Sequence, residues 1–252
     1  MDTKLNKDRI IPAALAAGIV LIVAGALLPK IGSEKIADVV VESKKRHQVL
    51  PSRKARSAQI ALIDAAVRHE VSPKLLLAVV WFETIKTFHV KIRPRRKNGT
   101  PIGSAIGLCQ FIKKTRILYG LPLKNDVMMR TSAVQQADAC ARLMADNIKV
   151  LKVSLGQEPE PYAVYLAHFL GVTKAVRFAK AKANVLTASL TTKKERKNNS
   201  LLKRKKTAGA LRKWARAKMA SGIKHVSIYV KRAPSVAGWR ATVPDNVFFA
   251  EK

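Results

Sequence analysis

The chain has 252 residues, of which 48% are hydrophobic and 25% are charged. This balance excludes a wholly disordered chain, because it leaves enough apolar side chains for a packed core in one medium-sized domain with extensions. Lys and Arg outnumber Asp and Glu by 48 to 16, which gives a formal net charge of +32. Such an excess predicts an anionic partner, and nucleic acid, an acidic lipid surface and an acidic wall polymer all remain open.

Residues 10–29 form an uncharged apolar run that, as a helix, would span about 30 Å, the hydrocarbon thickness of a bilayer. We therefore expect residues 1–30 to be an N-terminal transmembrane anchor. A cleavable signal peptide is the alternative, because the A-G-A sequence at 24–26 has the form of a cleavage site. The apolar run continues beyond that site, which favours the anchor. Residues 31–56 end in a polar, basic stretch and are expected to be a linker.

Residues 57–190 are expected to form a mainly α-helical domain, because apolar residues recur there at helical spacing and no segment alternates with a period of two. Ser72 and Pro73 are typical of a helix start, as an N-cap and a first-turn proline. The helix that follows is apolar all round from Leu75 to Phe82, which predicts a buried central helix. Further helical stretches are expected over residues 108–119, 131–154 and 161–182.

Glu83 ends this apolar helix, and an acid is an unusual residue there for packing alone. Apolar surroundings disfavour a carboxylate, and so does the negative end of the helix dipole, so both should raise the pKa of Glu83. A raised pKa suits a general acid that works near neutral pH. The alternative is a side chain that faces solvent or pairs with Lys86 or Arg93.

Two further segments carry polar residues suited to binding or chemistry. In the sequence SAIGLCQF, Gly107 lets a ligand approach the backbone and Gln110 offers a donor and an acceptor to a sugar. An ordinary junction between a loop and a helix is the alternative. In VYLAHFLG, Tyr165 and His168 lie three residues apart on one face of a helix. There the alternative is an interior pair satisfied by backbone groups.

The order of these motifs carries a resemblance to a known family. Glu83 followed by Thr84, then G-L-x-Q-F from Gly107 to Phe111, then Y-L-A-H-F-L-G, resembles the lytic transglycosylases of the soluble-lytic-transglycosylase type. The last motif is most similar to that of phage-borne members. The resemblance covers residues 57–182. It implies a lysozyme-like α-helical fold that cleaves the glycan strands of peptidoglycan.

The resemblance also implies roles for single residues. Glu83 is expected to be the catalytic acid and base, with Tyr165 and His168 beside it. The residues expected to line the glycan site are Thr84, Ser104, Gly107, Gln110 and Phe111. Together with the anchor, this substrate implies an inner-membrane protein with its catalytic domain in the periplasm or otherwise outside the cytoplasm, or a virion-associated one.

The acidic residues of the chain favour one mechanism over another. A glycosidase with two carboxylates needs a second acid near the scissile bond, and no Asp or Glu occurs between Glu83 and Asp126. We therefore expect cleavage between N-acetylmuramic acid and N-acetylglucosamine by the substrate's own C6 hydroxyl, with a 1,6-anhydro product. Hydrolysis by a muramidase, and a wall-binding or virion structural protein without activity, are the alternatives.

Cys109 and Cys140 predict one disulfide if the domain lies outside the cytoplasm, or two buried thiols. Because the chain has no C-x-x-C spacing and no His cluster, neither a metal site nor a cofactor is expected. Residues 191–252 are expected to be a basic extension of unknown fold, with a short basic helix at 210–220 and a strand at 225–230. We interpret this extension as an attachment to an acidic wall polymer or lipid surface, and solvated charge that keeps a membrane protein soluble is the alternative. Nucleic acid is disfavoured as the main partner, because residues 191–209 hold no aromatic side chain for stacking on bases.

Overall fold

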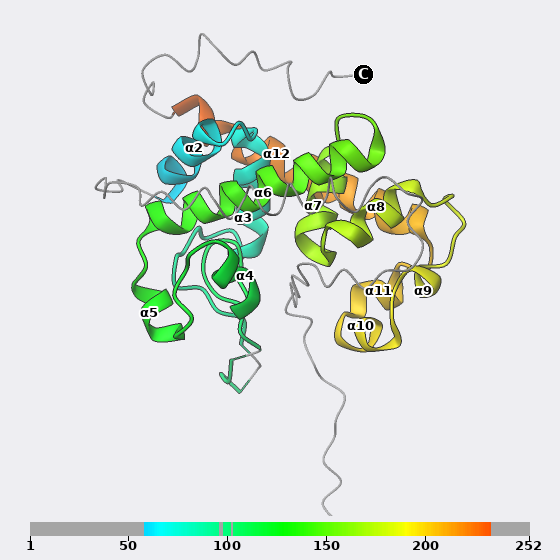
Figure 1. Ribbon diagram of the computed structural model, residues 1–252, viewed down its shortest axis with the longest axis horizontal. Helices are drawn as coiled ribbons and strands as arrows, with labels where there is room; N and C mark the ends of the chain where they lie inside the picture. The colour runs from blue at the N-terminus through cyan, green and yellow to red at the C-terminus, as the bar shows by residue number, and fades with distance from the viewer. Residues whose placement is uncertain (1–57, 96–97, 102, 233–252) are drawn as a thin grey trace, which may run out of the picture.

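The structure is a computed structural model that describes residues 58–95, 98–101 and 103–232. The predicted anchor and linker lie outside these residues. The described part of the chain is built from helices, with isolated β-bridges and no extended sheet, which confirms the mainly α-helical prediction (Figure 1). None of its helices is long and apolar enough to cross a membrane.

The helices differ widely in length, and the two longest are α6 and α12. In chain order they are α2 (Ala58–Arg68), α3 (Pro73–Glu83), α4 (Lys113–Leu118), α5 (Asn125–Arg130), α6 (Ala133–Leu155), α7 (Pro161–Leu170), α8 (Val172–Lys180), α9 (Thr187–Leu190), α10 (Lys193–Asn198), α11 (Ser200–Arg204) and α12 (Ala208–Arg232).

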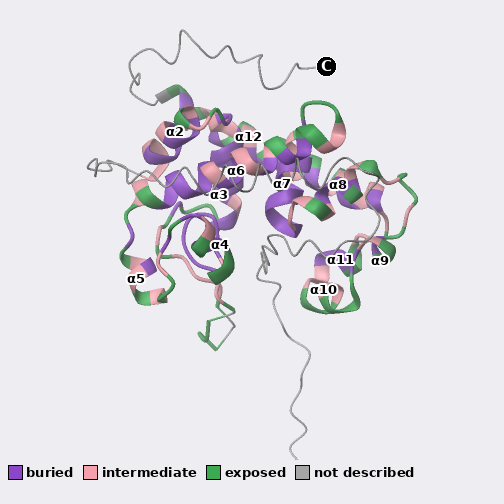
Figure 2. Ribbon diagram, in the orientation of Figure 1, coloured by how far each residue is buried: buried purple, intermediate pink, exposed green. Residues whose placement is uncertain are grey.

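Helix α3 is the buried central helix that its apolar sequence predicts. It begins where expected, because the Ser72 side chain accepts a hydrogen bond from the Leu75 amide and proline occupies the first turn. Every residue from Leu75 to Trp81 is buried (Figure 2). Helix α3 packs chiefly against α12 and α2, with a smaller contact to α6.

Helix α6 confirms the long helix predicted over residues 131–154, although it begins two residues later than predicted. A capping box between Ser132 and Gln135 fixes that start, and Gly156 ends the helix in the left-handed conformation. The single helix predicted over 161–182 is wrong in one respect. Gly171, with φ 87° and ψ 147°, interrupts it, so that α7 and α8 are separate helices that pack against each other.

The predicted strand at 225–230 is wrong, because these residues belong to α12. Its buried apolar residues recur at intervals of four and seven positions, which is a helical period and not a strand period. They are Leu211, Ala215, Met219, Val226 and Val230. The basic helix predicted at 210–220 is thus the first part of a longer one, and the segment before it contains α10 and α11.

Helix α12 is part of the packed core, although its sequence is strongly basic. A Cβ atom added at Gly222 would lie 2.7 Å from the Phe82 ring and 3.2 Å from the Ala78 Cβ, so glycine lets α12 approach α3 this closely. The same helix packs against α7 and α8. The described part of the basic C-terminal region therefore belongs to the same packed unit as α3 and α7.

Candidate active site

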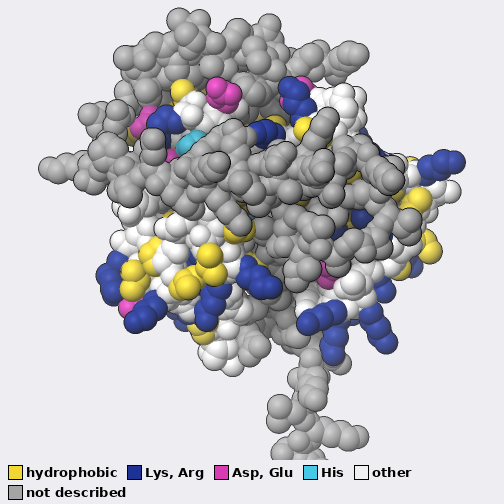
Figure 3. Space-filling view, in the orientation of Figure 1, with side chains coloured by type: hydrophobic (Ala, Val, Ile, Leu, Met, Phe, Trp, Pro, Cys, Tyr) yellow, Lys and Arg dark blue, Asp and Glu magenta, His cyan; other side chains and the backbone are white. Residues whose placement is uncertain are grey.

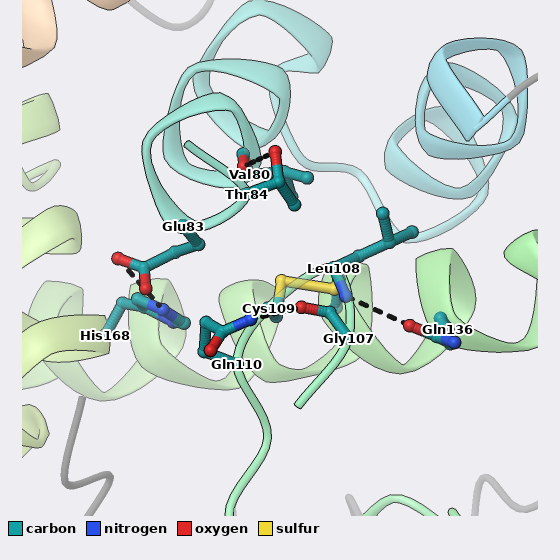
Figure 4. Close-up of a disulfide and its surroundings, with 10 residues drawn as sticks. Val80, Glu83, Thr84, Gly107, Leu108, Cys109, Gln110, Gln136 and His168 are labelled. Carbon is teal, nitrogen blue, oxygen red and sulfur yellow. Dashed lines mark hydrogen bonds and ion pairs between the residues drawn. A yellow bond between two sulfur atoms is a disulfide. The ribbon is translucent and has the colours of Figure 1, made fainter. Parts of the chain in front are cut away.

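Glu83 lies at the C-terminal end of α3 with its side chain inside the protein. That side chain is only 3% exposed, which rules out the solvent-facing alternative. Lys86 does not pair with it and instead places its ammonium group over the Trp81 ring. Instead, the His168 imidazole of α7 faces Glu83, with Nε2 3.7 Å from Glu83 Oε1. Figure 4 shows the two side chains pointing toward each other.

The chain after Glu83 is held in an unusual backbone conformation. Thr84 ends the helix, because its hydroxyl donates to the Val80 carbonyl over 2.8 Å and accepts from the Phe88 amide over 2.9 Å. Ile85 and Lys86 then adopt positive φ angles of 51° and 67°. Such angles in residues other than glycine are sterically unfavourable and occur often at functional sites.

Burial changes the proton affinity of both side chains in the pair. It raises the pKa of Glu83 from 4.5 to about 7, and the nearby Lys218 ammonium partly opposes this rise. Burial, together with the smaller effect of the Lys218 charge, lowers the pKa of His168 from 6.5 to about 4. Near neutral pH, Glu83 can therefore hold or release a proton while His168 stays neutral. This is the state that a residue acting first as acid and then as base requires.

Tyr165 faces the same region from α7, one turn before His168, as the sequence spacing predicts. The residue is fully buried, and its phenol oxygen accepts a hydrogen bond from Lys218 Nζ over 2.7 Å. Burial raises the pKa of Tyr165 well above its ordinary value, and the charge of Glu83 adds to this effect. Tyr165 is therefore a neutral hydroxyl near Glu83 at any physiological pH.

Lys218 is the residue of the site that the sequence analysis did not find. It comes from α12, and its ammonium lies 4.4 Å, 4.8 Å and 5.1 Å from the ring centres of Phe82, Tyr165 and Trp214. Burial lowers the pKa of Lys218. A lysine four residues after a tryptophan on one helix was a detectable signal, but it occurs in a region so rich in Lys that no single position stands out.

The G-L-C-Q-F turn is fixed to α6 by two devices. Gly107 has φ +82°, and a Cβ atom there would lie 2.3 Å from Gln136 Oε1, so only glycine fits. The same Gln136 oxygen accepts a hydrogen bond from the Leu108 amide over 3.0 Å. A disulfide joins Cys109 to Cys140 of α6, which settles the choice between a disulfide and two thiols (Figure 4).

Gln110 belongs to this turn, and Figure 4 draws its side chain on the side of the turn toward His168. It has a positive φ of 49°, and its amide nitrogen donates to the Gly107 carbonyl over 2.8 Å. Its Oε1 atom is buried and makes no hydrogen bond within the described part of the chain, and the same holds for His168 Nε2. Buried polar atoms without partners are rare and costly in folded proteins, and one of these two, His168 Nε2, lies 3.7 Å from the Glu83 carboxyl.

The other residues expected to contact glycan have structural roles. The Thr84 hydroxyl is used at the end of α3, and Phe111 is 1% exposed within the core. Ser104 Oγ accepts a hydrogen bond from the Lys113 amide over 3.4 Å, and its carbonyl accepts one from Arg116. The geometry therefore brings Glu83, Tyr165 and His168 together with Lys218. Thr84, Ser104 and Phe111 make contacts within the fold, and their contact with glycan stays a prediction.

No protein-family model matches this chain, and no curated protein matches it significantly in sequence. The family resemblance thus depends on the motifs and on the arrangement described above. Among the described residues, no three His, Cys, Asp or Glu side chains gather in a way that would hold a metal ion.

Proposed function

We propose that this protein is a peptidoglycan lytic transglycosylase with a lysozyme-like helical domain. In this proposal Glu83 is the general acid and base for cleavage of the β-1,4 bond between N-acetylmuramic acid and N-acetylglucosamine. The observation that carries the proposal is a buried carboxyl whose pKa burial raises to about 7, 3.7 Å from a neutral imidazole nitrogen that has no hydrogen-bond partner among the described residues. Such a cluster is typical of a site built for a ligand and for proton transfer.

The charges around Glu83 favour the single-acid route. The described groups that contact Glu83 or act on it electrostatically are His168, Tyr165 and Lys218, and none of them is a carboxylate. A mechanism with two carboxylates therefore has no second acid among them. Protonated Glu83 would donate to the glycosidic oxygen, and the resulting carboxylate would accept the proton of the C6 hydroxyl as the 1,6-anhydro ring closes. The nucleophile is then part of the substrate and already positioned.

Glycan binding has to open this site. Glu83 and His168 are 3% and 4% exposed, so a sugar ring cannot reach them unless neighbouring groups move aside. The sugar would then supply hydrogen bonds to Gln110 Oε1 and His168 Nε2, which relieves their unsatisfied state. Substrate binding and the exclusion of water would in this way occur together.

The remaining surface suits attachment to an anionic layer. Glu195 is the only acidic residue between positions 161 and 232, a stretch rich in Lys and Arg. Figure 3 shows basic side chains on the face that carries α10 and α11. We propose an acidic wall polymer or lipid surface as the partner of this face. The disulfide fits an oxidising compartment, in line with a domain held outside the cytoplasm by an anchor at residues 10–29 or carried in a virion.

Digestion of purified peptidoglycan tests the proposal. Wild type should release fragments with 1,6-anhydro ends, which mass spectrometry distinguishes because they are lighter by one water than reducing ends. Glu83→Gln should abolish release, because an amide cannot transfer the proton, whereas Glu158→Gln at an exposed position should leave it intact. Reducing ends would point to a hydrolytic muramidase instead. Binding to walls without any release by wild type would refute catalysis and favour a structural wall-binding protein on the same fold.

A further inference from the structure

We propose that Lys218 of the basic helix α12 is a positioning residue of this site, which holds the Tyr165 hydroxyl and stabilises the carboxylate form of Glu83. The role of that carboxylate in the second half of the reaction rests on the proposed function. The interaction of Lys218 with Tyr165 and Glu83 does not depend on the proposed function, because it is inferred from contacts within the folded protein.

The contacts of Lys218 are those of a fixed side chain, not of a surface lysine. Its ammonium donates to the Tyr165 phenol oxygen over 2.7 Å and lies within 5.1 Å of the ring centres of Phe82, Tyr165 and Trp214. Removing an ammonium from water is unfavourable unless hydrogen bonds and aromatic faces compensate. By contrast, Lys213 and Lys224 of the same helix face solvent.

The Lys218 ammonium has opposite effects on the charged forms of its two neighbours, Glu83 and His168. Its charge lowers the pKa of Glu83, against the effect of burial, and so favours the carboxylate. Its charge also lowers the pKa of His168, and so disfavours the imidazolium. Lys218 therefore favours the charged form of Glu83 and the neutral form of His168. Of these two side chains, only Glu83 gains or loses a proton near neutral pH.

The groups that face Glu83 come from two helices packed on α3. From α7 these are His168 and Tyr165, and from α12 it is Lys218. His225, which also comes from α12, stacks on the Trp81 ring of α3, with ring centres 4.3 Å apart. Among these groups Lys218 supplies the positive charge, because His168 stays neutral near pH 7.

The hydrogen bond to Tyr165 has a consequence for orientation. A phenol oxygen that accepts from an ammonium directs its own hydrogen away from that ammonium. Glu83 acts electrostatically on Tyr165, so the carboxyl lies close enough to influence this hydroxyl. Lys218 thus orients Tyr165 as well as supplying charge, and both effects depend on a residue of the C-terminal helix.

A direct titration of Glu83 tests the inference without any glycan. The carbon-13 resonance of the Glu83 carboxyl, assigned by its absence in Glu83→Gln, would be followed against pH in wild type and in Lys218→Met. We expect the midpoint to rise by about one pH unit or more in Lys218→Met, which removes the charge but keeps the length of the side chain. Lys218→Arg and the exposed control Lys224→Met should keep the wild-type midpoint.

An unchanged midpoint in a folded Lys218→Met protein would overturn the inference. If that variant does not fold by circular dichroism, Lys218→Gln provides the comparison, because its amide can still donate to Tyr165 without carrying charge. The same variants link the inference to catalysis. The high-pH limb of the kcat/KM profile should move upward with the Glu83 midpoint in the uncharged variant and stay in place in Lys218→Arg. Absence of glycan cleavage in wild type would refute the proposed function, while the titration would still decide the role of Lys218.

Discussion

Exchange of Glu83 for Gln should change how the stability of the protein depends on pH. Burial raises the pKa of this carboxyl from 4.5 to about 7, and unfolding returns it to water. Between these two values the folded protein keeps a proton that the unfolded chain has released. The contribution of Glu83 to stability is therefore fully present below about pH 4.5 and is lost as the pH rises through about 7. Gln has nearly the same shape and does not titrate.

The size of the effect follows from the difference between the two pKa values. A pKa difference of one unit between the folded and unfolded states corresponds to about 1.4 kcal/mol. A rise in pKa from 4.5 to about 7 therefore corresponds to about 3 kcal/mol. The free energy of unfolding of Glu83→Gln, compared with that of wild type, should increase by this amount between acid and mildly alkaline pH. The variant should thus be the more stable protein at high pH, although the proposed function expects it to be inactive.

His168 provides a second slope of opposite sign. Its pKa falls from 6.5 to about 4 on folding, so its contribution is present above 6.5 and is lost as the pH falls toward 4. In wild type the two slopes oppose each other over nearly the same range of pH. Glu83→Gln should remove the falling slope, so that the stability of the variant rises with pH more steeply than that of wild type.

Urea unfolding over a series between about pH 4 and pH 8 measures these curves. The exposed Glu158→Gln provides the control, and its curve should run parallel to that of wild type. Parallel curves for wild type and Glu83→Gln would mean that the Glu83 carboxyl titrates as it does in water. That result would refute the burial argument on which the proposed acid and base role depends.

Three further outcomes are expected. Reduction of the disulfide between α6 and the G-L-C-Q-F turn should lower the free energy of unfolding by about 2–4 kcal/mol in urea titrations with and without reductant, because the linked residues are 31 apart in sequence. Gly107→Ala should destabilise by about 2–3 kcal/mol, because its Cβ would collide with Gln136 Oε1, whereas Gly156→Ala, at a similar φ with open space, should cost only about 1 kcal/mol by the same measurement. Val226→Asp should abolish the cooperative thermal transition, since it places an unpaired carboxylate in the core, whereas Ile228→Asp at a 44% exposed position of the same helix should preserve it.

Local rules were sufficient to predict α3 and α6 from sequence. Ser72 followed by Pro73 and the apolar run after them are short-range signals, and their outcome depends little on distant residues. The capping box that fixes the start of α6 is equally local, although the helix was predicted without it. The pairing of Glu83 with His168 was expected from the family resemblance, and helical spacing by itself predicted only that Tyr165 and His168 share a face of α7. The contacts of Thr84 and Phe111 within the fold could not be predicted, because a motif does not show which hydrogen bonds a side chain makes.

The misassigned region was the C-terminal one, and charge is the physical reason. In α12 the apolar stripe is a narrow strip between Lys and Arg positions, and it shows only when residues are taken at intervals of three and four. Composition therefore suggested a solvated extension, whereas the helix buries that stripe against α3 and α7. A division of the chain into a catalytic domain and a basic attachment region places Lys218 on the wrong side of the boundary. Since Lys218 contacts Tyr165 directly, a truncation before α12 would remove part of the site together with part of the core, and the loss of activity that it causes would say nothing about attachment to the wall.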